Sequence, residues 1–583
     1  MIKEFSLSND KVMMNFTKKY CNNFEDILES NGFKNVLTHY LNKKINRKDN
    51  IFKYFLRGIE NLDDFIESLI KITELLTIFD REEVINMKVK YGYILEDKYK
   101  FDYLIDDFYS YWIKLERYTI LTQNSVNEGI IKLGFVSANS RFTNLIMELY
   151  RKTKDSVTSK EPLVYRQLKS GNNASIVLNT YSWKCKTYEI VEGVKFMDTI
   201  SLETPFISYP KNNTRSGIFE EVFENPLLNC ELESENWFCY PAKVGELLAF
   251  IYFHRDFMAN GIALSNLFEM AHRDEYIDTK PDIVYLYGVE DVTINKKNEY
   301  KTVFYDDKEN DILVGVVTYN QKVDYFGYLK KMTLTLHNIS MIKKGYLPIH
   351  GAMTSITLKD GREANIVIVG DSGAGKSESL EAFRSLAEEH ISDMNIIFDD
   401  MGVLKIAHDG VYGYGTEIGA FVRLDDLDQG YAFKEIDRSI FMNPDKTNAR
   451  LVMPVSSYRD IIMGNKVDLF LYANNYDEAD DCTIKLFGSS EIEKVINIFK
   501  EGKRLAKGTT SEKGLVSSYF ANPFGPVQKK EETDVLLDKY FSKMFEFGVK
   551  VGEVKTCLGI SGMEKHGPKN AALDLFKMIK NKE

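Results

Sequence analysis

Residues 366–377 read IVIVGDSGAGKS, and this stretch decides the fold class that we predict for the 583-residue chain. Its first part, IVIV, is β-branched throughout and has the composition of a buried strand. The rest, GDSGAGKS, fits the pattern G-x-x-x-x-G-K-[S/T] in full, and an amphipathic helical pattern follows over 378–389. A strand, a glycine-rich loop and a helix in this order are typical of nucleotide binding. The sequence therefore predicts an α/β unit built around a phosphate loop.

Each residue type in the glycine-rich loop suits a phosphate ligand. The glycines let backbone N–H groups turn inward toward phosphate oxygens, and the helix N-terminus adds partial positive charge. We expect Lys376 to neutralise the β- and γ-phosphates of ATP, and Ser377 to offer its hydroxyl to Mg²⁺. The predicted nucleotide-binding residues are Gly370, Asp371, Ser372, Gly373, Ala374, Gly375, Lys376 and Ser377.

Two adjacent carboxylates follow the loop in the segment NIIFDD, residues 395–400. Asp399 and Asp400 close an apolar strand in this interpretation, which places them well for a metal ion beside the phosphates. Adjacent carboxylates repel each other, so the pair makes most sense where a cation neutralises them. Asp-Asp-Met-Gly also has the composition of a turn, and from these residues alone both interpretations stay open.

The segment YFGYLKKMTLTLHNISMIKKGYLPIH, residues 325–350, lies upstream of the loop. Together with the loop and the Asp-Asp pair it resembles the ATP-using phosphoenolpyruvate carboxykinase family. That family carries Y-x-G-x-x-K-K, then K-G-x-x-x-x-H, then G-x-S-G-x-G-K-T and D-D, and Ser377 stands here in place of the threonine. Outside the loop, the matching positions are Tyr325, Gly327, Lys330, Lys331, Asn338, Lys344, Gly345, His350, Asp399, Asp400 and, in TNARLVMP, Arg450.

The resemblance implies that Lys331, His350 and Asp400 are ligands of a catalytic Mn²⁺. A lysine ligand must be neutral, so neighbouring cations and the metal would have to lower its pKa. Imidazole and carboxylate groups also suit Mn²⁺. Taken singly, a Lys-Lys pair is usually a solvated surface and a histidine usually a packing residue. The joint match along the chain favours the metal site.

The resemblance also implies roles for the remaining matched residues. Lys330 and Arg450 would hold the transferred phosphoryl group and the enolate oxygen, and Tyr325 would lie beside the carboxylate or carbon dioxide. Asp399 is counted with these catalytic residues. In KGTTSEKG, Lys513 stands where the family has a nucleotide-binding arginine.

The substrate-binding loop R-S-P-K-D-K of the family has no clear counterpart. Arg215-Ser216 in NTRSGIFEE and Arg141 in SANSRFTN are the candidates for its arginine. The gap between His350 and Gly370 is longer than usual, and the Asp-Gly turn in TLKDGREAN predicts a larger hairpin there.

We predict a two-lobed α/β fold of the carboxykinase type with a helical N-terminal extension. Residues 1–150 are expected to be mostly helical, with apolar residues at three- and four-residue spacing over 51–79. Residues 151–345 form a mixed α/β substrate-side domain, with strands over 174–178, 282–288 and 311–319. Residues 346–583 form the catalytic domain, which binds nucleotide and metal.

The composition limits the kinds of binding partner that we expect. The net charge of −11 argues against nucleic acid but allows a local basic pocket for a triphosphate. The six cysteines include no C-x-x-C pair and are too sparse for a disulfide scaffold. The chain shows no signal peptide and no apolar stretch of membrane-spanning length, so we expect a cytoplasmic location without membrane attachment. The composition says nothing about oligomeric state.

The function predicted is ATP-dependent decarboxylation and phosphorylation of oxaloacetate to phosphoenolpyruvate, with Mn²⁺ and Mg²⁺. The expected ligands are a nucleotide and a small dicarboxylic acid. An alternative is a kinase of the same phosphate-loop superfamily, similar to HPr kinase, acting on another small molecule or a protein with Asp399 or Asp400 as base. A third hypothesis is a non-catalytic nucleotide sensor. An arginine from residues 130–220 at the metal site would favour the carboxykinase over the kinase.

Overall fold

The computed structural model shows a mixed α/β protein with several sheets. By its internal contacts the chain divides into two compact units, which are described separately. Unit 1 comprises Met1–Ser182 and Lys195–Phe206, and unit 2 comprises Trp183–Val194 and Ile207–Glu583. The residues that the structure describes are 4–46, 50–122, 128–158, 170–215, 217–228, 230–290, 302–371, 373–376, 378–379, 382–383, 390–424, 436–479, 482–506 and 514–580.

Unit 1 contains a sheet whose strands are ordered β1-β2-β3-β4-β5. Strands β2, β3 and β4 are parallel, whereas β1 and β5 each run antiparallel to their neighbour. The short strands β1 to β3 lie within the region predicted to be mostly helical. The sequence interpretation missed them because β4, which completes their sheet, lies far along the chain. Their bounds are β1 (Phe5–Ser8), β2 (Lys11–Asn15), β3 (Glu116–Thr122), β4 (Ala174–Leu178) and β5 (Lys195–Leu202).

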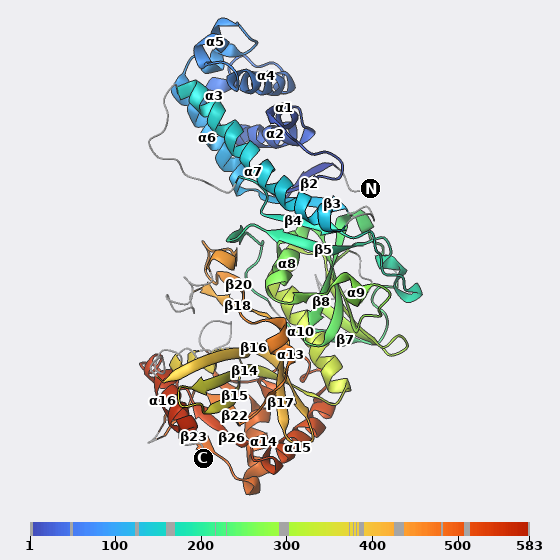
Figure 1. Ribbon diagram of the computed structural model, residues 1–583, viewed down its shortest axis with the longest axis vertical. Helices are drawn as coiled ribbons and strands as arrows, with labels where there is room; N and C mark the ends of the chain where they lie inside the picture. Colours follow the sequence, from blue (N-terminus) through green and yellow to red (C-terminus); the bar gives the residue numbers. More distant parts are fainter. Residues whose placement is uncertain are drawn as a thin grey trace. The chain divides into compact units, whose positions relative to one another are not determined.

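Helices make up most of the rest of unit 1 (Figure 1). In α4 the side chain of Asn61 caps the first turn, and Phe65, Leu69 and Ile72 on one face are buried. The apolar spacing predicted over 51–79 is therefore confirmed, with a break between α3 and α4. The helices are α1 (Phe24–Leu28), α2 (Asn31–Asn46), α3 (Asn50–Phe55), α4 (Leu62–Leu76), α5 (Arg81–Asn86), α6 (Lys98–Lys114) and α7 (Glu128–Thr158).

The first sheet of unit 2 has the strand order β8-β9-β11-β13-β12-β7, with β10 paired to β8. Strands β9, β11 and β13 are parallel and almost wholly buried, as their β-branched composition predicts. The predicted strands at 282–288 and 311–319 are confirmed as β11 and β13. The bounds are β7 (Glu220–Val222), β8 (Trp237–Val244), β9 (Leu247–His254), β10 (Glu269–Met270), β11 (Ile283–Val289), β12 (Thr302–Asp307) and β13 (Ile312–Thr318).

The second sheet of unit 2 carries the glycine-rich loop and is ordered β21-β17-β16-β14-β15-β22-β26-β23. The predicted hairpin is confirmed, because β14 and β15 pair antiparallel across the Asp-Gly turn. The bounds are β14 (Leu347–Leu358), β15 (Glu363–Val369), β16 (Ile391–Ile406), β17 (Val411–Gly415), β21 (Asn465–Lys466), β22 (Leu469–Asn474), β23 (Ile484–Leu486) and β26 (Lys550–Lys555).

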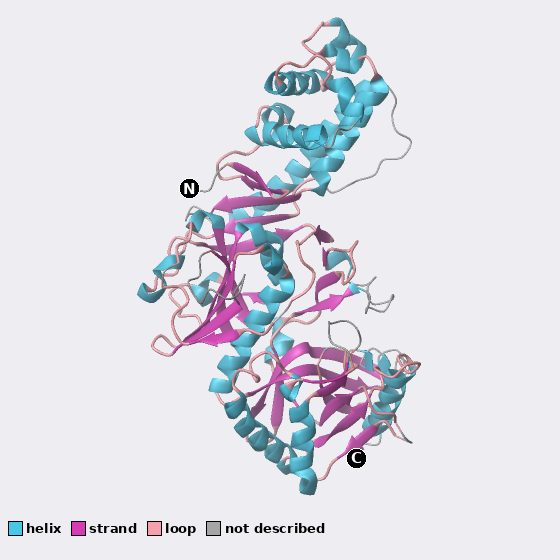
Figure 2. Ribbon diagram, turned by 180° about the vertical axis from the view of Figure 1, so that it is seen from behind, coloured by secondary structure: helices cyan, strands magenta, loops and turns pink. Residues whose placement is uncertain are grey.

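Helices cover both faces of this second sheet (Figure 2). Alternate residues of β15 point to opposite faces. Val367 and Val369 pack into a core with α14 (Ile492–Glu501) and α15 (Lys530–Glu546). Ile366 and Ile368 pack into a separate core with α16 (His566–Lys580). The sheet is therefore the middle layer of three.

Helix α10 (Phe326–Lys343) contacts strands of the first and of the second sheet of unit 2. Nearly all of its residues are buried, and they include Lys330, His337 and Asn338. The helix therefore places polar side chains inside the protein, and Lys330 lies in its second turn. Further helices and strands are β6 (Phe206–Ser208), α8 (Met258–Ala263), α9 (Arg273–Tyr276), β18 (Gly419–Arg423), β19 (Ile440–Met442), β20 (Arg450–Pro454), α13 (Tyr458–Ile462), β24 (Lys503–Leu505) and β25 (Leu515–Ser517).

Within the described residues, no helix combines the length and apolar character needed to cross a bilayer. All six cysteines are free thiols.

Candidate functional site

The register of three neighbouring strands brings the predicted site together. On β14, His350 pairs with Met401 of β16, and the next residue, Gly351, pairs with Asp400. Gly351 also pairs with Val369 at the end of β15, where the glycine-rich loop begins. Segments that are far apart in the sequence therefore meet at one point of the sheet.

The Asp-Asp pair does not end its strand, which corrects the sequence interpretation. Strand β16 continues to Ile406, because the apolar residues after Asp400 pair with both β14 and β17. The turn interpretation is therefore wrong. Consecutive strand residues point to opposite faces, so Asp399 and Asp400 do not act as one pair. Asp400 is the carboxylate that faces the lysines of α10.

Asp400 is the centre of a buried cluster of charged side chains. Its Oδ2 lies 2.6 Å from Nζ of Lys330 and 2.7 Å from Nζ of Lys331. Its Oδ1 lies 3.0 Å from Nε2 of His350. Lys330 also pairs with Glu417, at 2.8 Å, and its side chain is only 1% exposed. A lysine this deeply buried is stable as a cation only because two carboxylates hold it.

The two adjacent lysines have opposite pKa shifts. Burial would lower the pKa of Lys330, but Asp400 and Glu417 together raise it above the ordinary lysine value. Burial lowers the pKa of Lys331, and the neighbouring charge of Lys330 lowers it further. Burial would raise the pKa of Asp400, yet the two lysines hold it well below its usual range. Lys330 therefore stays charged, while Lys331 is the lysine closer to losing its proton.

The pKa of Glu417 is raised, whereas the pKa of Asp400 is lowered. Burial raises the pKa of Glu417 to about 7, and the nearby Asp400 carboxylate adds to this effect. Glu417 lies between β17 and β18, outside every motif of the sequence, so motif matching could not have found it.

His350 has the tautomer of a metal ligand. Its Nδ1 lies 2.8 Å from the backbone oxygen of Ala521, which can only accept, so Nδ1 carries the proton. Burial lowers the pKa of His350 and favours the neutral ring, which leaves a lone pair on Nε2. That lone pair faces a carboxylate oxygen of Asp400 at 3.0 Å, an arrangement that needs a cation or a proton between the two atoms. Imidazole, carboxylate and a lysine of lowered pKa form a donor set that fits Mn²⁺.

In the described part of the chain, no group of three or more His, Cys, Asp or Glu side chains could hold a metal ion. The donor set at Asp400 includes two such side chains, and its third member is the amine of Lys331.

The glycine-rich loop lies beside this cluster. Gly375 has a φ of +95°, and a Cβ there would lie 2.6 Å from Oγ1 of Thr556, so only glycine fits. Lys376 is buried, and its Nζ donates to the backbone oxygen of Asp371 at 3.1 Å. Asn475 donates to the oxygen of Gly373 at 2.9 Å. Ser372, Ser377 and most of the predicted following helix lie outside the described residues.

Asp371 joins the loop to two further basic side chains. Its carboxylate accepts a hydrogen bond from Nε of Arg504 on β24 at 2.9 Å and lies 3.6 Å from Nδ1 of His350. Arg504 is almost completely buried. It belongs to no motif, so the sequence interpretation missed it. Lys513, the predicted nucleotide-binding residue nearby in sequence, lies outside the described residues.

The ring of Phe524 brings two cations together. Nζ of Lys331 lies 4.6 Å from the ring centroid, and the guanidinium of Arg215 lies 5.1 Å from it. Asn338 of α10 holds this segment by donating to the backbone oxygen of Phe524 at 2.7 Å. Of the two arginine candidates, Arg215 is therefore beside the cluster, whereas Arg141 lies on α7 in unit 1. Ser216 lies outside the described residues.

Tyr325 and Arg450 share a neighbour, the ring of Phe421 on β18. The guanidinium of Arg450 lies 5.3 Å from the centroid of the Phe421 ring. The ring centroids of Tyr325 and Phe421 are 5.7 Å apart. Burial raises the pKa of Tyr325, and the positive charge of Arg450 opposes this shift. Arg450 of β20 is the backbone partner of Arg423 on β18.

The chain was compared with protein-family models and with curated proteins, and neither comparison finds a match.

Proposed function

We propose that this chain is a carboxykinase-like enzyme that converts oxaloacetate and ATP into phosphoenolpyruvate, carbon dioxide and ADP. One observation carries the proposal. Lys331 and His350, which the family resemblance selects from separate segments, both lie on Asp400, at 2.7 Å and 3.0 Å. The glycine-rich loop begins one strand away. The proposal includes a two-lobed carboxykinase-like fold with a phosphate loop, which suits the first and second sheets of unit 2 and the helix α10 that contacts both.

Lys331, His350 and Asp400 are the residues that would hold Mn²⁺. When bound, the ion supplies positive charge that polarises the keto and carboxylate oxygens of the substrate. Nδ1 of His350 donates a hydrogen bond to the backbone oxygen of Ala521, and this bond fixes the orientation of Nε2. Lys330, held charged by Glu417, provides a second positive charge that does not depend on the metal.

The chemistry needs charge stabilisation more than covalent help from the protein. The bond from the departing carboxylate to its carbon breaks, carbon dioxide leaves, and the electron pair remains as an enolate. The enolate oxygen then attacks the γ-phosphorus of ATP, and ADP leaves. Lys376 would neutralise the phosphates, and Lys330 and Arg450 would hold the transferred group. Arg215 is the charge available for the substrate carboxylate.

Arg215 also bears on the choice between the two enzyme hypotheses. A kinase with a different acceptor needs the loop and a carboxylate base, but no arginine from this part of the chain. The Arg215 guanidinium lies against the same Phe524 ring as Lys331, so Arg215 brings the charge expected for a dicarboxylic acid beside the cluster. This favours the carboxykinase. The free thiols suit a reducing compartment such as the cytoplasm, where we propose that the enzyme works.

A coupled assay with oxaloacetate, ATP and Mn²⁺ tests the proposal, with GTP and pyrophosphate as alternative donors. His350→Ala and Lys331→Ala should abolish oxaloacetate-dependent ATP consumption and leave ATP affinity unchanged. His408→Ala, whose side chain is 93% exposed, is the matched control and should keep full activity. Near-normal turnover in both site variants would refute the proposal. ATP consumption that requires another acceptor instead of oxaloacetate would favour the kinase.

A further inference from the structure

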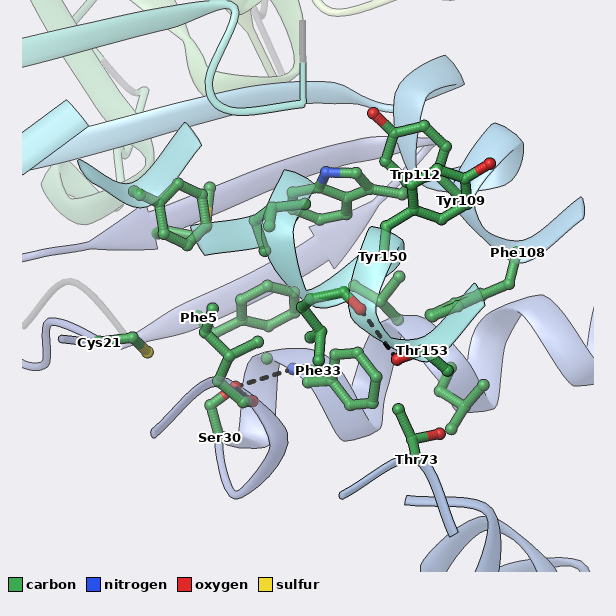
Figure 3. A pocket seen from close by; sticks show the side chains of 18 of the residues that line it. Phe5, Cys21, Ser30, Phe33, Thr73, Phe108, Tyr109, Trp112, Tyr150 and Thr153 are labelled. Atoms are coloured by element: carbon green, nitrogen blue, oxygen red, sulfur yellow. Dashed lines mark hydrogen bonds between the residues drawn. The ribbon is translucent and has the colours of Figure 1, made fainter. Parts of the chain in front are cut away.

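We propose that unit 1 contains a binding site for an apolar ligand, separate from the charged cluster of unit 2. A cavity of about 170 Å³ lies among β1, β2 and helices α1, α2, α4, α6 and α7. Figure 3 shows aromatic side chains around it, contributed by strand and helices alike. They include Phe5, Phe33, Phe108, Tyr109, Trp112 and Phe142.

The hydroxyl groups in the cavity wall already donate hydrogen bonds within the protein, those of Tyr109 and Tyr150 to Sδ of Met147 at 3.6 Å and to Oδ1 of Asp106 at 2.7 Å. Thr73 and Thr153 each donate to the backbone oxygen four residues earlier in the same helix, both at 2.8 Å. Ser30 donates to the oxygen of Ile27 at 2.7 Å and accepts from the N–H of Phe33 at 3.0 Å (Figure 3). A sugar or a nucleotide base would lose its hydrogen bonds to water here without replacement. The wall therefore selects hydrocarbon.

The size of the cavity also indicates a ligand. Protein cores are packed with few voids larger than a water molecule, and a void destabilises the fold in proportion to its volume. An apolar cavity of about 150 Å³ stays dry and accepts benzene. The cavity of unit 1 is slightly larger, so it fits a hydrocarbon ring or chain of about six carbons.

One part of the cavity wall reaches the surface. Lys19, which is exposed, and Glu4 and Cys21, which are half-buried, line the cavity together with the apolar residues. A ligand with a polar head group can therefore place its hydrocarbon part inside and leave the head in water. The site accepts either an aromatic ring or an alkyl chain, and two probes distinguish them.

The test measures the melting temperature of the full chain with and without benzene or octanoate, each at millimolar concentration. A ligand that binds only the folded state raises the melting temperature. We expect an increase of several degrees with at least one probe: benzene alone indicates a ring, and octanoate alone a chain. Val36→Phe, which fills the cavity, should remove this increase, whereas Val136→Phe, at a valine 55% exposed, should keep it. No increase with either probe would overturn the proposal.

A second measurement keeps the proposal testable if Val36→Phe does not fold. Trp112 lines the cavity, and the other two tryptophans, Trp183 and Trp237, belong to unit 2. Octanoate carrying bromine on its last carbon should quench tryptophan fluorescence with saturation, and Trp112→Phe should lose this saturable quenching. Equal quenching in Trp112→Phe and in the unchanged protein would show binding elsewhere and would refute the site.

Discussion

Glu417 allows a quantitative test of the charged cluster. In Glu417→Gln the amide keeps the volume of the side chain. In the unchanged protein the Glu417 carboxylate lies 2.8 Å from Nζ of Lys330, and the amide oxygen of the variant can accept from the same Nζ. The pKa of Glu417 is about 7 in the folded protein and 4.5 when unperturbed. Between these two values the folded state holds a proton that the unfolded state has released. Ionised Glu417 therefore destabilises the fold, fully above pH 7, and this cost disappears as the pH falls to 4.5.

The magnitude follows from the size of the shift. A shift from 4.5 to about 7 corresponds to roughly 3 kcal/mol at 1.36 kcal/mol for each pKa unit. We expect the stability of Glu417→Gln, relative to the unchanged protein, to be about 3 kcal/mol more favourable at pH 8 than at pH 4.5. The difference should develop mainly between these two pH values.

The assay is urea unfolding of both proteins at several pH values between 4.5 and 8, followed by circular dichroism. Glu220→Gln, an exposed position on β7, is the matched control and should show a small difference at every pH. A relative stability of Glu417→Gln that does not change with pH would refute the reasoning. It would mean that Lys330 compensates the buried carboxylate completely.

Three further predictions concern other residues. His337 is fully buried, and burial lowers its pKa to about 4. The free energy of unfolding should therefore fall by about 3 kcal/mol as the pH falls from 6.5 to 4. Urea unfolding of His337→Gln should not show this loss. Gly375→Ala places a Cβ 2.6 Å from Thr556, and calorimetric titration should show ATP affinity reduced at least tenfold; unchanged affinity would exclude the loop as the phosphate site. Arg215→Lys should raise KM for oxaloacetate without changing KM for ATP in steady-state kinetics, and equal changes in both would contradict a role at the substrate carboxylate.

Local patterns in the sequence were sufficient for the strand that precedes the glycine-rich loop and for the hairpin to which that strand belongs. The β-branched run before Gly370 and the Asp-Gly turn before it predicted β15 and the β14–β15 hairpin, because strand composition and turn chemistry act over a few residues. The same patterns predicted strands in unit 2 that the structure confirms. The family resemblance also selected Lys331 and His350, which the structure brings next to Asp400.

The sequence was less informative where partners come from distant segments. Asp400 lies in the middle of β16 because two neighbouring strands continue to pair beyond it, which the local turn composition could not indicate. Strands β1 to β3 were missed for the same reason, since β3 depends on pairing with β4. Strand pairing is a non-local property, so short strands carry a weak signal of their own.

The sequence by itself determined the glycine-rich loop, the strand before it and the residue types that could hold phosphate and a metal ion, because these depend on neighbours in the chain. Only the tertiary structure decided which charges share one buried site. Glu417 and Arg504 entered it without a motif, and burial together with neighbouring charge separated the pKa values of Lys330 and Lys331. Desolvation and Coulomb interactions depend on distances in space, so no pattern along the chain encodes them.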